Sequence, residues 1–169
     1  MRYSLWIEPP LEVADKYLAI IDGLAIRYEA EFFDPHLTLY TTIIGDESEV
    51  VKTVEALASE VKAIEIHLGA LESGDEFYRA LYISADETPS WSDAFARADN
   101  ALRAFTDGGP RIAPPHMSLL YADMEEDEKR KIMNVLGREF NDTFICNTFS
   151  LWRTDGMPEE WVKIVSFAL

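Results

Sequence analysis

The sequence predicts an α+β protein built from two similar lobes. Strand and helix patterns are interspersed along the chain, and from His36 onward the order strand, helix, strand, strand occurs twice. A helix leads into each copy, and each copy opens with proline, histidine, an apolar residue and a hydroxyl residue. This order indicates an internal duplication, and the cleft between two such lobes is where a ligand is expected.

The N-terminal segment predicts a strand over residues 2–7, which a Pro-Pro pair ends. Pro10 suits the start of a helix because the missing N–H costs nothing there. Apolar residues at helical spacing extend that helix over residues 11–28, with Gly23 as a weak point that costs about 1 kcal/mol relative to alanine. The first motif strand follows over residues 36–44.

The middle of the chain begins with a helix over residues 47–61, whose apolar side chains fall on one face. Two strands follow, over residues 63–72 and 77–85. The Ser-Gly-Asp sequence at 73–75 joins them, which is typical of a hairpin.

The second half of the chain predicts two more helices. The first opens at Thr88 and is stopped by the Asp-Gly-Gly-Pro sequence at residues 107–110. Asp123 is placed to cap the second, whose first turn is acidic and suits the positive helix end. The elements expected here cover residues 88–105, 116–122, 124–140, 143–153 and 161–169.

Length and composition are those of an ordinary globular protein. The chain has 169 residues, 48% hydrophobic and 27% charged, so we expect one domain, monomeric, over residues 1–169. Cys146 is the only cysteine, which excludes an internal disulfide and a cysteine-based metal site. The N-terminus lacks the apolar run of a signal peptide, and no segment has the length and hydropathy of a membrane span. We therefore expect a cytosolic protein that does not enter membranes.

The net charge restricts the class of partner. Asp and Glu number 31 against 15 Lys and Arg, which gives a formal charge of −16. Proteins that track RNA or DNA cluster Lys and Arg, because neutralising phosphates supplies binding free energy. The charge therefore disfavours a long nucleic acid and favours a small phosphorylated molecule.

The two Pro-His motifs carry the functional prediction. Side chains alternate between the faces of a strand, so His36 and Thr38 project from one face while Leu37 lies on the other. The second motif repeats this pattern with His116 and Ser118. The chain thus offers two imidazole-hydroxyl pairs, which we interpret as the two halves of one catalytic site.

Two imidazoles suit acid-base work on a cyclic phosphodiester. Their ordinary pKa near 6.5 lets a neutral histidine accept a proton from water while a protonated one donates to the departing oxygen. The hydroxyls can donate hydrogen bonds to the phosphate oxygens, and the scheme needs no metal or other cofactor. A lone histidine at a strand start is usually structural. His67, which lacks a hydroxyl two residues further on, is interpreted in that way.

These motifs resemble those of the 2H phosphoesterase superfamily, whose mark is a pair of His-x-Thr/Ser motifs. Within it the chain is most similar to the plant- and yeast-type cyclic phosphodiesterases. The likeness covers nearly the whole chain. It rests on Tyr3-Ser4-Leu5-Trp6, Phe33-Asp34-Pro35-His36-Leu37-Thr38, Pro115-His116-Met117-Ser118-Leu119-Leu120-Tyr121 and Glu160-Trp161.

The resemblance implies a bilobal α+β fold, with two antiparallel sheets facing across a central cleft and helices outside. It also implies metal-independent opening of ADP-ribose 1″,2″-cyclic phosphate, and of nucleoside 2′,3′-cyclic phosphates to 2′-phosphates. His36, Thr38, His116 and Ser118 match the catalytic positions. By this likeness His36 leans toward the base and His116 toward the acid, and the reverse holds if the substrate is turned around.

Aromatic residues are the candidates for substrate contact. Strict alternation puts Tyr40 on the face of His36 but puts Tyr121 on the face opposite His116. The resemblance favours Tyr121 as a substrate contact, which a bulge or strand end near Leu120 would permit. Aromatics that either stack on a base or fill the core are Trp6, Trp152, Tyr82 and Trp161, of which the first two are retained as substrate-binding candidates.

Two other functions compete with a hydrolase of small cyclic nucleotides. One is a relative that acts on RNA ends or on 2′,5′-linked oligoadenylate, against which the negative charge counts. The other is a catalytically silent nucleotide-binding module, against which the presence of both histidines and both hydroxyls counts. Turnover with excess chelator separates an enzyme from a binder.

Overall fold

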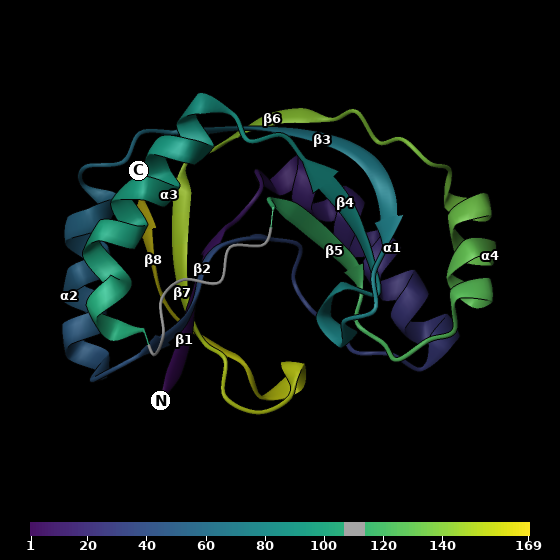
Figure 1. Cartoon of the computed structure of the whole chain (residues 1–169), viewed down its shortest axis with the longest axis horizontal. Helices are drawn as coiled ribbons and strands as arrows, with labels where there is room; N and C mark the ends of the chain where they lie inside the picture. Colours follow the sequence, from purple (N-terminus) through teal and green to yellow (C-terminus); the bar gives the residue numbers. More distant parts are fainter. Residues whose placement is uncertain (107–113) are drawn as a thin grey trace.

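The computed structural model describes residues 1–106 and 114–169, so the expected helix stop at residues 107–110 lies outside the described residues. Within the described part, eight strands form one curled antiparallel sheet, with helices on its outer side (Figure 1). The strands are β1 (Arg2–Ile7), β2 (Leu37–Ile44), β3 (Ile64–Ser73), β4 (Leu81–Ala85), β5 (His116–Leu120), β6 (Thr143–Cys146), β7 (Thr148–Arg153) and β8 (Val162–Ala168). The α-helices are α1 (Leu11–Tyr28), α2 (Glu47–Ala58), α3 (Pro89–Leu102) and α4 (Glu126–Leu136), and the short 3₁₀ turns are η1 (Phe77–Arg79), η2 (Arg103–Phe105) and η3 (Pro158–Glu160).

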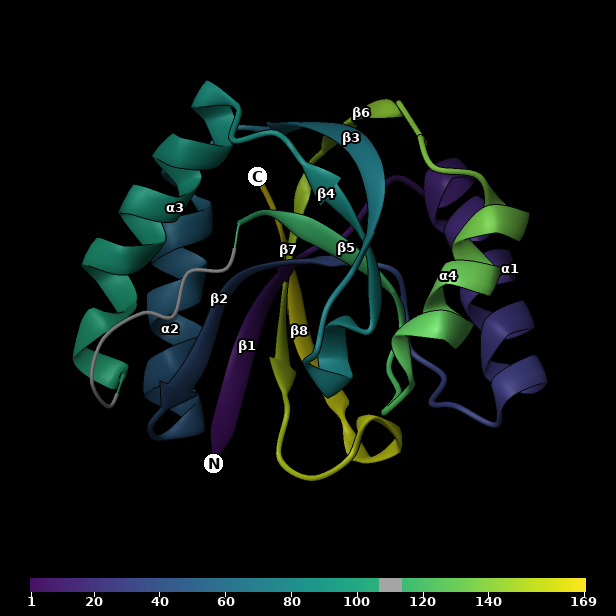
Figure 2. The same ribbon diagram turned by 45° about the vertical axis from the view of Figure 1, so that its right-hand side comes forward.

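The sheet consists of two four-stranded halves. Its strand order is β6-β3-β4-β5-β2-β1-β7-β8, and the halves meet where Leu37 of β2 pairs with Met117 of β5. Helices α1 and α4 lie together at one flank and α2 and α3 at the other, as Figure 2 shows. The expected α+β class with outer helices is confirmed, and the two expected sheets are joined through the two motif strands.

The two halves interleave in sequence. Strands β1 and β2 pair with β7 and β8 from the other end of the chain, whereas β3, β4, β5 and β6 make up the second half. The chain therefore crosses between halves after β2 and again after β6. Both motif strands consequently lie side by side at the centre of the sheet, although their histidines are far apart in sequence.

Three local expectations are corrected. Residues 77–79, expected in a strand, form the 3₁₀ turn η1 instead. The segment 143–153, expected as one strand, divides at Asn147, because β6 pairs with β3 and β7 pairs with β1 in opposite halves. Helix α4 takes Glu125 rather than Asp123 as its N-cap.

Strand β1 shows how the sheet separates core from site. Tyr3, Leu5 and Ile7 on one of its faces are fully buried in the core. On the other face lie Ser4 and Trp6, whose side chains reach the cavity described below. Burial of one face of each central strand is what fixes the register of the motif strands.

Candidate active site

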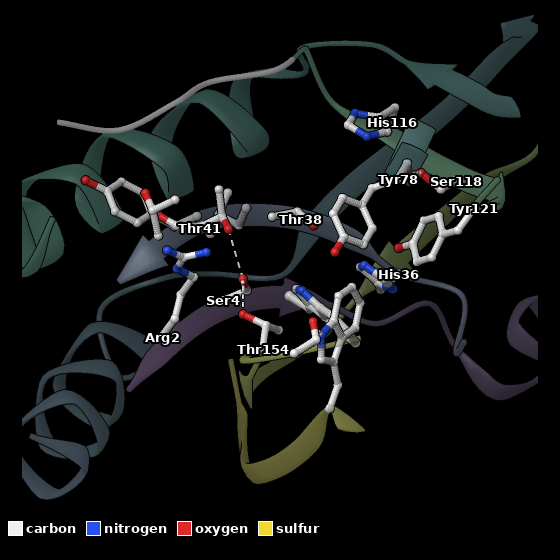
Figure 3. A pocket seen from close by; sticks show the side chains of 16 residues that line it. Arg2, Ser4, His36, Thr38, Thr41, Tyr78, His116, Ser118, Tyr121 and Thr154 are labelled. Atoms are coloured by element: carbon white, nitrogen blue, oxygen red, sulfur yellow. Dashed lines mark hydrogen bonds between the residues drawn. The ribbon is translucent and has the colours of Figure 1, made fainter. Parts of the chain in front are cut away.

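A cavity of about 370 Å³ opens between the two halves of the sheet. It is lined from β1, β2, η1, β5 and the turn after β7, and Figure 3 shows the side chains around it. Although 31 of the 169 residues are acidic, no Asp or Glu lines it in the described part of the chain. The absence of carboxylates suits an anionic ligand. The lining residues are Arg2, Ser4, Trp6, His36, Thr38, Leu39, Tyr40, Thr41, Thr42, Tyr78, His116, Ser118, Tyr121, Thr154, Gly156 and Trp161.

The imidazole of His36, directly before β2, is held in one orientation. Its Nδ1 lies 2.7 Å from the carbonyl oxygen of Asp34. A carbonyl only accepts, so Nδ1 carries the proton and Nε2 is left as the free acceptor. Only 6% of the residue is exposed, and this burial is the main reason that its pKa is lowered to about 4. A positive charge on His116, which lines the same cavity, lowers it further.

The imidazole of His116, the first residue of β5, is held in the same way. Its Nδ1 lies 2.8 Å from the carbonyl oxygen of Pro114, again two residues earlier, so the same tautomer follows. Burial is the main cause that lowers its pKa, and the nearby Arg79 guanidinium adds to the effect. Both histidines therefore line one cavity with Nε2 unengaged by these carbonyls.

The two hydroxyls beside the histidines differ in their contacts. Both Thr38 and Ser118 line the cavity. The Ser118 hydroxyl donates to the carbonyl oxygen of Tyr78 at 2.8 Å, which ties η1 to β5. To donate to a ligand, this hydroxyl has to leave that carbonyl, and the tie therefore makes the two halves of the site unequal.

A bulge in β5 settles where Tyr121 points. Leu81 pairs with Leu120 but Tyr82 pairs with Ser118, so β5 carries one extra residue against β4. The extra residue shifts the alternation and returns Tyr121 to the side of the motif residues, where it lines the cavity. Its ring stacks on Phe33, and burial raises the pKa of its hydroxyl.

Tyr40 also lines the cavity, as its place in the strand predicts. Its hydroxyl donates to Asp99 of α3 at 3.1 Å. Burial and this carboxylate raise the pKa of Tyr40 to about 12, so the hydroxyl stays protonated. The bond to α3 anchors the ring at the wall of the cavity.

Of the two tryptophans selected from the sequence, only Trp6 lines this cavity. Its indole lies between His36 and Trp152, so Trp152 sits behind it as a second layer. Trp152 instead borders a second hollow, together with Trp6, Leu18 and Phe33. It does not line the main cavity, because β7 lies one strand further from the motif strands than β1 does, and contact between Trp152 and a substrate stays a prediction.

Sequence reasoning missed several lining residues. A signal existed for Arg2 and Ser4, because they alternate with Trp6 along one polar face of an otherwise buried strand. Tyr78 and Thr154 lie in turns, where no periodicity marks a face. Trp161, which we did not retain as a substrate-binding candidate, also lines the cavity and donates from Nε1 to the carbonyl oxygen of Gly156 at 3.3 Å.

Within residues 1–106 and 114–169, no three or more His, Cys, Asp or Glu side chains gather as a metal ion would need. No described helix combines the length and hydropathy required to traverse a bilayer.

Comparison with solved structures identifies proteins of the same fold. TT0787 of Thermus thermophilus superposes with a TM-score of 0.70 at 14% identity and covers 100% of this chain and 98% of its own. The E. coli LigT structure with 3′-AMP gives a TM-score of 0.67 at 16% identity, over 99% of this chain and 96% of its own. The chain therefore shares the fold of these two proteins over nearly its whole length.

Sequence comparison then identifies the family. The family described as "Cyclic phosphodiesterase-like protein" matches residues 1–169, and the chain belongs to it. The "Cyclic phosphodiesterase" of Arabidopsis thaliana is 26% identical over 76% of this chain and 69% of its own length. The "2′,3′-cyclic-nucleotide 3′-phosphodiesterase" of Yarrowia lipolytica is 26% identical over 95% of this chain and 96% of its own. The expected enzyme class, a cyclic phosphodiesterase, is confirmed.

Proposed function

We propose that the protein hydrolyses small cyclic phosphodiesters, with His36 and His116 as a paired base and acid. One observation carries this proposal. Both rings line a single cavity in the same tautomer, each with Nδ1 bound to the carbonyl two residues earlier. Two imidazoles held in this way can address opposite sides of one phosphorus atom.

His36 serves as the base in this scheme. Its pKa of about 4 keeps the ring neutral near neutral pH, so Nε2 is free to take a proton from water. The water oxygen bonds to phosphorus while the bond from phosphorus to the 3′ oxygen breaks. His116, protonated, gives its Nε2 proton to that leaving oxygen. The product is a 2′-phosphate, and the sum of the steps is the addition of one water molecule.

His116 takes up its proton from solvent when the anionic substrate binds. Burial lowers the pKa of His116 in the free protein, whereas an anionic phosphate bound beside it favours the imidazolium. Thr38 and Ser118 donate hydrogen bonds to the non-bridging phosphate oxygens in this scheme and stabilise the charge that develops there. Tyr121 packs against the sugar and base in this scheme, whereas Trp6, covered on both faces by His36 and Trp152, meets them only with its edge.

Small nucleotides are the proposed substrates, in particular ADP-ribose 1″,2″-cyclic phosphate and nucleoside 2′,3′-cyclic phosphates. The name of the Yarrowia relative, a 3′-phosphodiesterase of 2′,3′-cyclic nucleotides, supports opening at the 3′ oxygen. LigT shares the fold and has been crystallised with 3′-AMP, NADP⁺ or ATP, which supports a small substrate. The charge of −16 supports the same choice over a long RNA. The proposal also holds that the protein acts in the cytosol as a monomer.

Turnover in the presence of EDTA tests this function. The purified protein is incubated with adenosine 2′,3′-cyclic phosphate, ADP-ribose 1″,2″-cyclic phosphate and a short RNA that ends in a cyclic phosphate. We expect both small substrates to be opened at rates that chelator does not change, with 2′-phosphate as the product from the nucleoside. Binding without turnover would identify a silent module, and preference for the RNA would identify an RNA-end enzyme. Activity that returns only with added metal would refute the mechanism.

A further inference from the structure

The cavity extends beyond the histidines to a second polar end. Figure 3 shows His36, His116 and Tyr121 at one end and Arg2, Ser4, Thr41 and Thr154 at the other. The hydroxyl residues Ser4, Thr41 and Thr154 are called the distal hydroxyl cluster, and the Arg2 guanidinium lies beside them. The catalytic scheme above uses none of these four residues.

A bulge in β2 assembles the cluster. Tyr3 pairs with Ile43 while Leu5 pairs with Tyr40, so one extra residue of β2 lies opposite Ser4. Thr42 takes a φ of 59°, which is unusual and strained for a β-branched residue. Such strain persists where the surrounding structure enforces it, and it is concentrated at ligand sites.

The distal hydroxyl cluster contains at least one O–H group that is not donated within the cluster. Ser4 Oγ lies 2.9 Å from Thr41 Oγ1 and 3.1 Å from Thr154 Oγ1. Three O–H groups share two contacts, so at least one proton is left for another acceptor. The Thr42 hydroxyl is engaged with the carbonyl oxygen of Thr41 at 2.7 Å and does not compete.

Arg2 adds a positive charge to this end. Among the described residues its guanidinium makes no ion pair, although its backbone N–H donates to both carboxylate oxygens of Asp155 at 3.1 Å. The Asp155 carboxylate is thus bonded to the backbone of Arg2 and not to its guanidinium. Spare hydroxyl donors beside a guanidinium are the partners that a phosphate oxygen prefers.

Strand geometry sets the distance between the two ends. A strand rises about 3.3 Å per residue, so Ser4 and Arg2 lie about 7 Å and about 13 Å along β1 from Trp6, which stacks on His36. The shorter of these two distances is close to the separation of two phosphates on the 2′ and 5′ oxygens of one ribose. The second phosphate of a diphosphate reaches further, toward Arg2.

We propose that the distal hydroxyl cluster and Arg2 bind a phosphate on the 5′ oxygen of the ribose whose cyclic phosphate is opened. This inference rests on the proposed function and narrows its substrate class. A nucleoside 2′,3′-cyclic phosphate without a 5′-phosphate leaves this end empty, whereas the diphosphate of ADP-ribose 1″,2″-cyclic phosphate occupies it. The acidic surface favours this small diphosphate over the phosphate of an RNA chain.

A matched pair of substrates tests the proposal. Adenosine 2′,3′-cyclic phosphate is compared with the same compound carrying a 5′-phosphate. We expect about a tenfold higher kcat/KM for the phosphorylated compound, chiefly through KM, which corresponds to about 1.4 kcal/mol. In Arg2→Ala and Thr41→Val this ratio should fall toward one. Thr53→Val on α2 and Arg130→Ala on α4, outside the cavity, should keep the wild-type ratio.

The remaining outcomes separate a failure of the subsite from a failure of the proposed function. A wild-type ratio near one, or a ratio that survives in Arg2→Ala and Thr41→Val, overturns the subsite. A short RNA with a cyclic end that is opened faster than ADP-ribose 1″,2″-cyclic phosphate overturns the assignment to a small diphosphate. If no cyclic substrate is opened, the proposed function fails, and calorimetry with ADP judges the subsite alone. Binding that Arg2→Ala abolishes supports it, and equal or absent binding refutes it.

Discussion

The indole of Trp6 lies flat on the imidazole of His36, with ring centroids 3.5 Å apart and planes inclined by 8°. Trp152 stacks on the far side of the indole at 4.4 Å, so the histidine rests on two aromatic layers. The stack keeps water from one face of the imidazole and, with the Asp34 carbonyl, fixes its plane. Trp6 is therefore a positioning residue for the proposed base.

Replacement of Trp6 by leucine should raise the pKa of His36. Burial is the largest cause of the lowered pKa, so opening one ring face to water moves the value from about 4 toward the ordinary 6.5. The acid limb of kcat/KM should move to higher pH by the same amount, and Trp6→Phe should largely restore it. Imidazole titration by NMR and the pH-rate profile measure both effects. An unchanged acid limb in Trp6→Leu contradicts the role.

Removal of either motif histidine should abolish most turnover. His36→Ala and His116→Ala are each expected to reduce kcat by roughly 100-fold or more, the usual contribution of a positioned acid or base. His67→Ala is the matched control, because that ring is half-buried outside the cavity and pairs with Glu65 and Asp86 instead. Steady-state kinetics on a cyclic nucleotide measures the difference. Near wild-type rates in either motif variant would remove the histidine pair from the mechanism.

The rate should follow a bell-shaped pH profile centred below neutral pH. The neutral form of His36 is required, so kcat/KM rises as pH increases through about 4. The protonated form of His116 is required, and its pKa in the free protein lies below 6.5, so kcat/KM falls again before that pH is reached. A profile measured from pH 3 to 9 at constant ionic strength checks both limbs. A rate that keeps rising above pH 7 is incompatible with this assignment.

Two glycine substitutions should change stability in opposite directions. Gly156 has a φ of 80°, and an added Cβ would collide with Glu160 Oε2, which accepts the Met157 N–H. Gly156→Ala should therefore lower the free energy of unfolding by about 1 to 2 kcal/mol. Gly23→Ala in α1 meets no atom within 4 Å and should raise it by about 1 kcal/mol. Urea titrations of both variants measure the two shifts, and shifts of equal sign would contradict the backbone argument.

Local patterns predicted most of the elements and the motif residues. The helix over residues 11–28 agrees with α1 because its caps and apolar spacing are properties of neighbouring residues. Residues 143–153 were interpreted wrongly as one strand, because the change of sheet half at Asn147 depends on partners elsewhere in the chain. The order of strands likewise decides which aromatic residues line the main cavity, and Trp152 is not among them.

The sequence by itself determined the residue types of the site and the strand faces of His36, Thr38, His116 and Ser118, because side-chain alternation is a local property of a strand. Only the tertiary structure decided that the two histidines share a cavity and lose solvent there, which lowers their pKa values. It also brought Ser4 to hydroxyls 37 and 150 positions away. Such contacts depend on strand order, register and bulges, and pairing between distant segments sets all three.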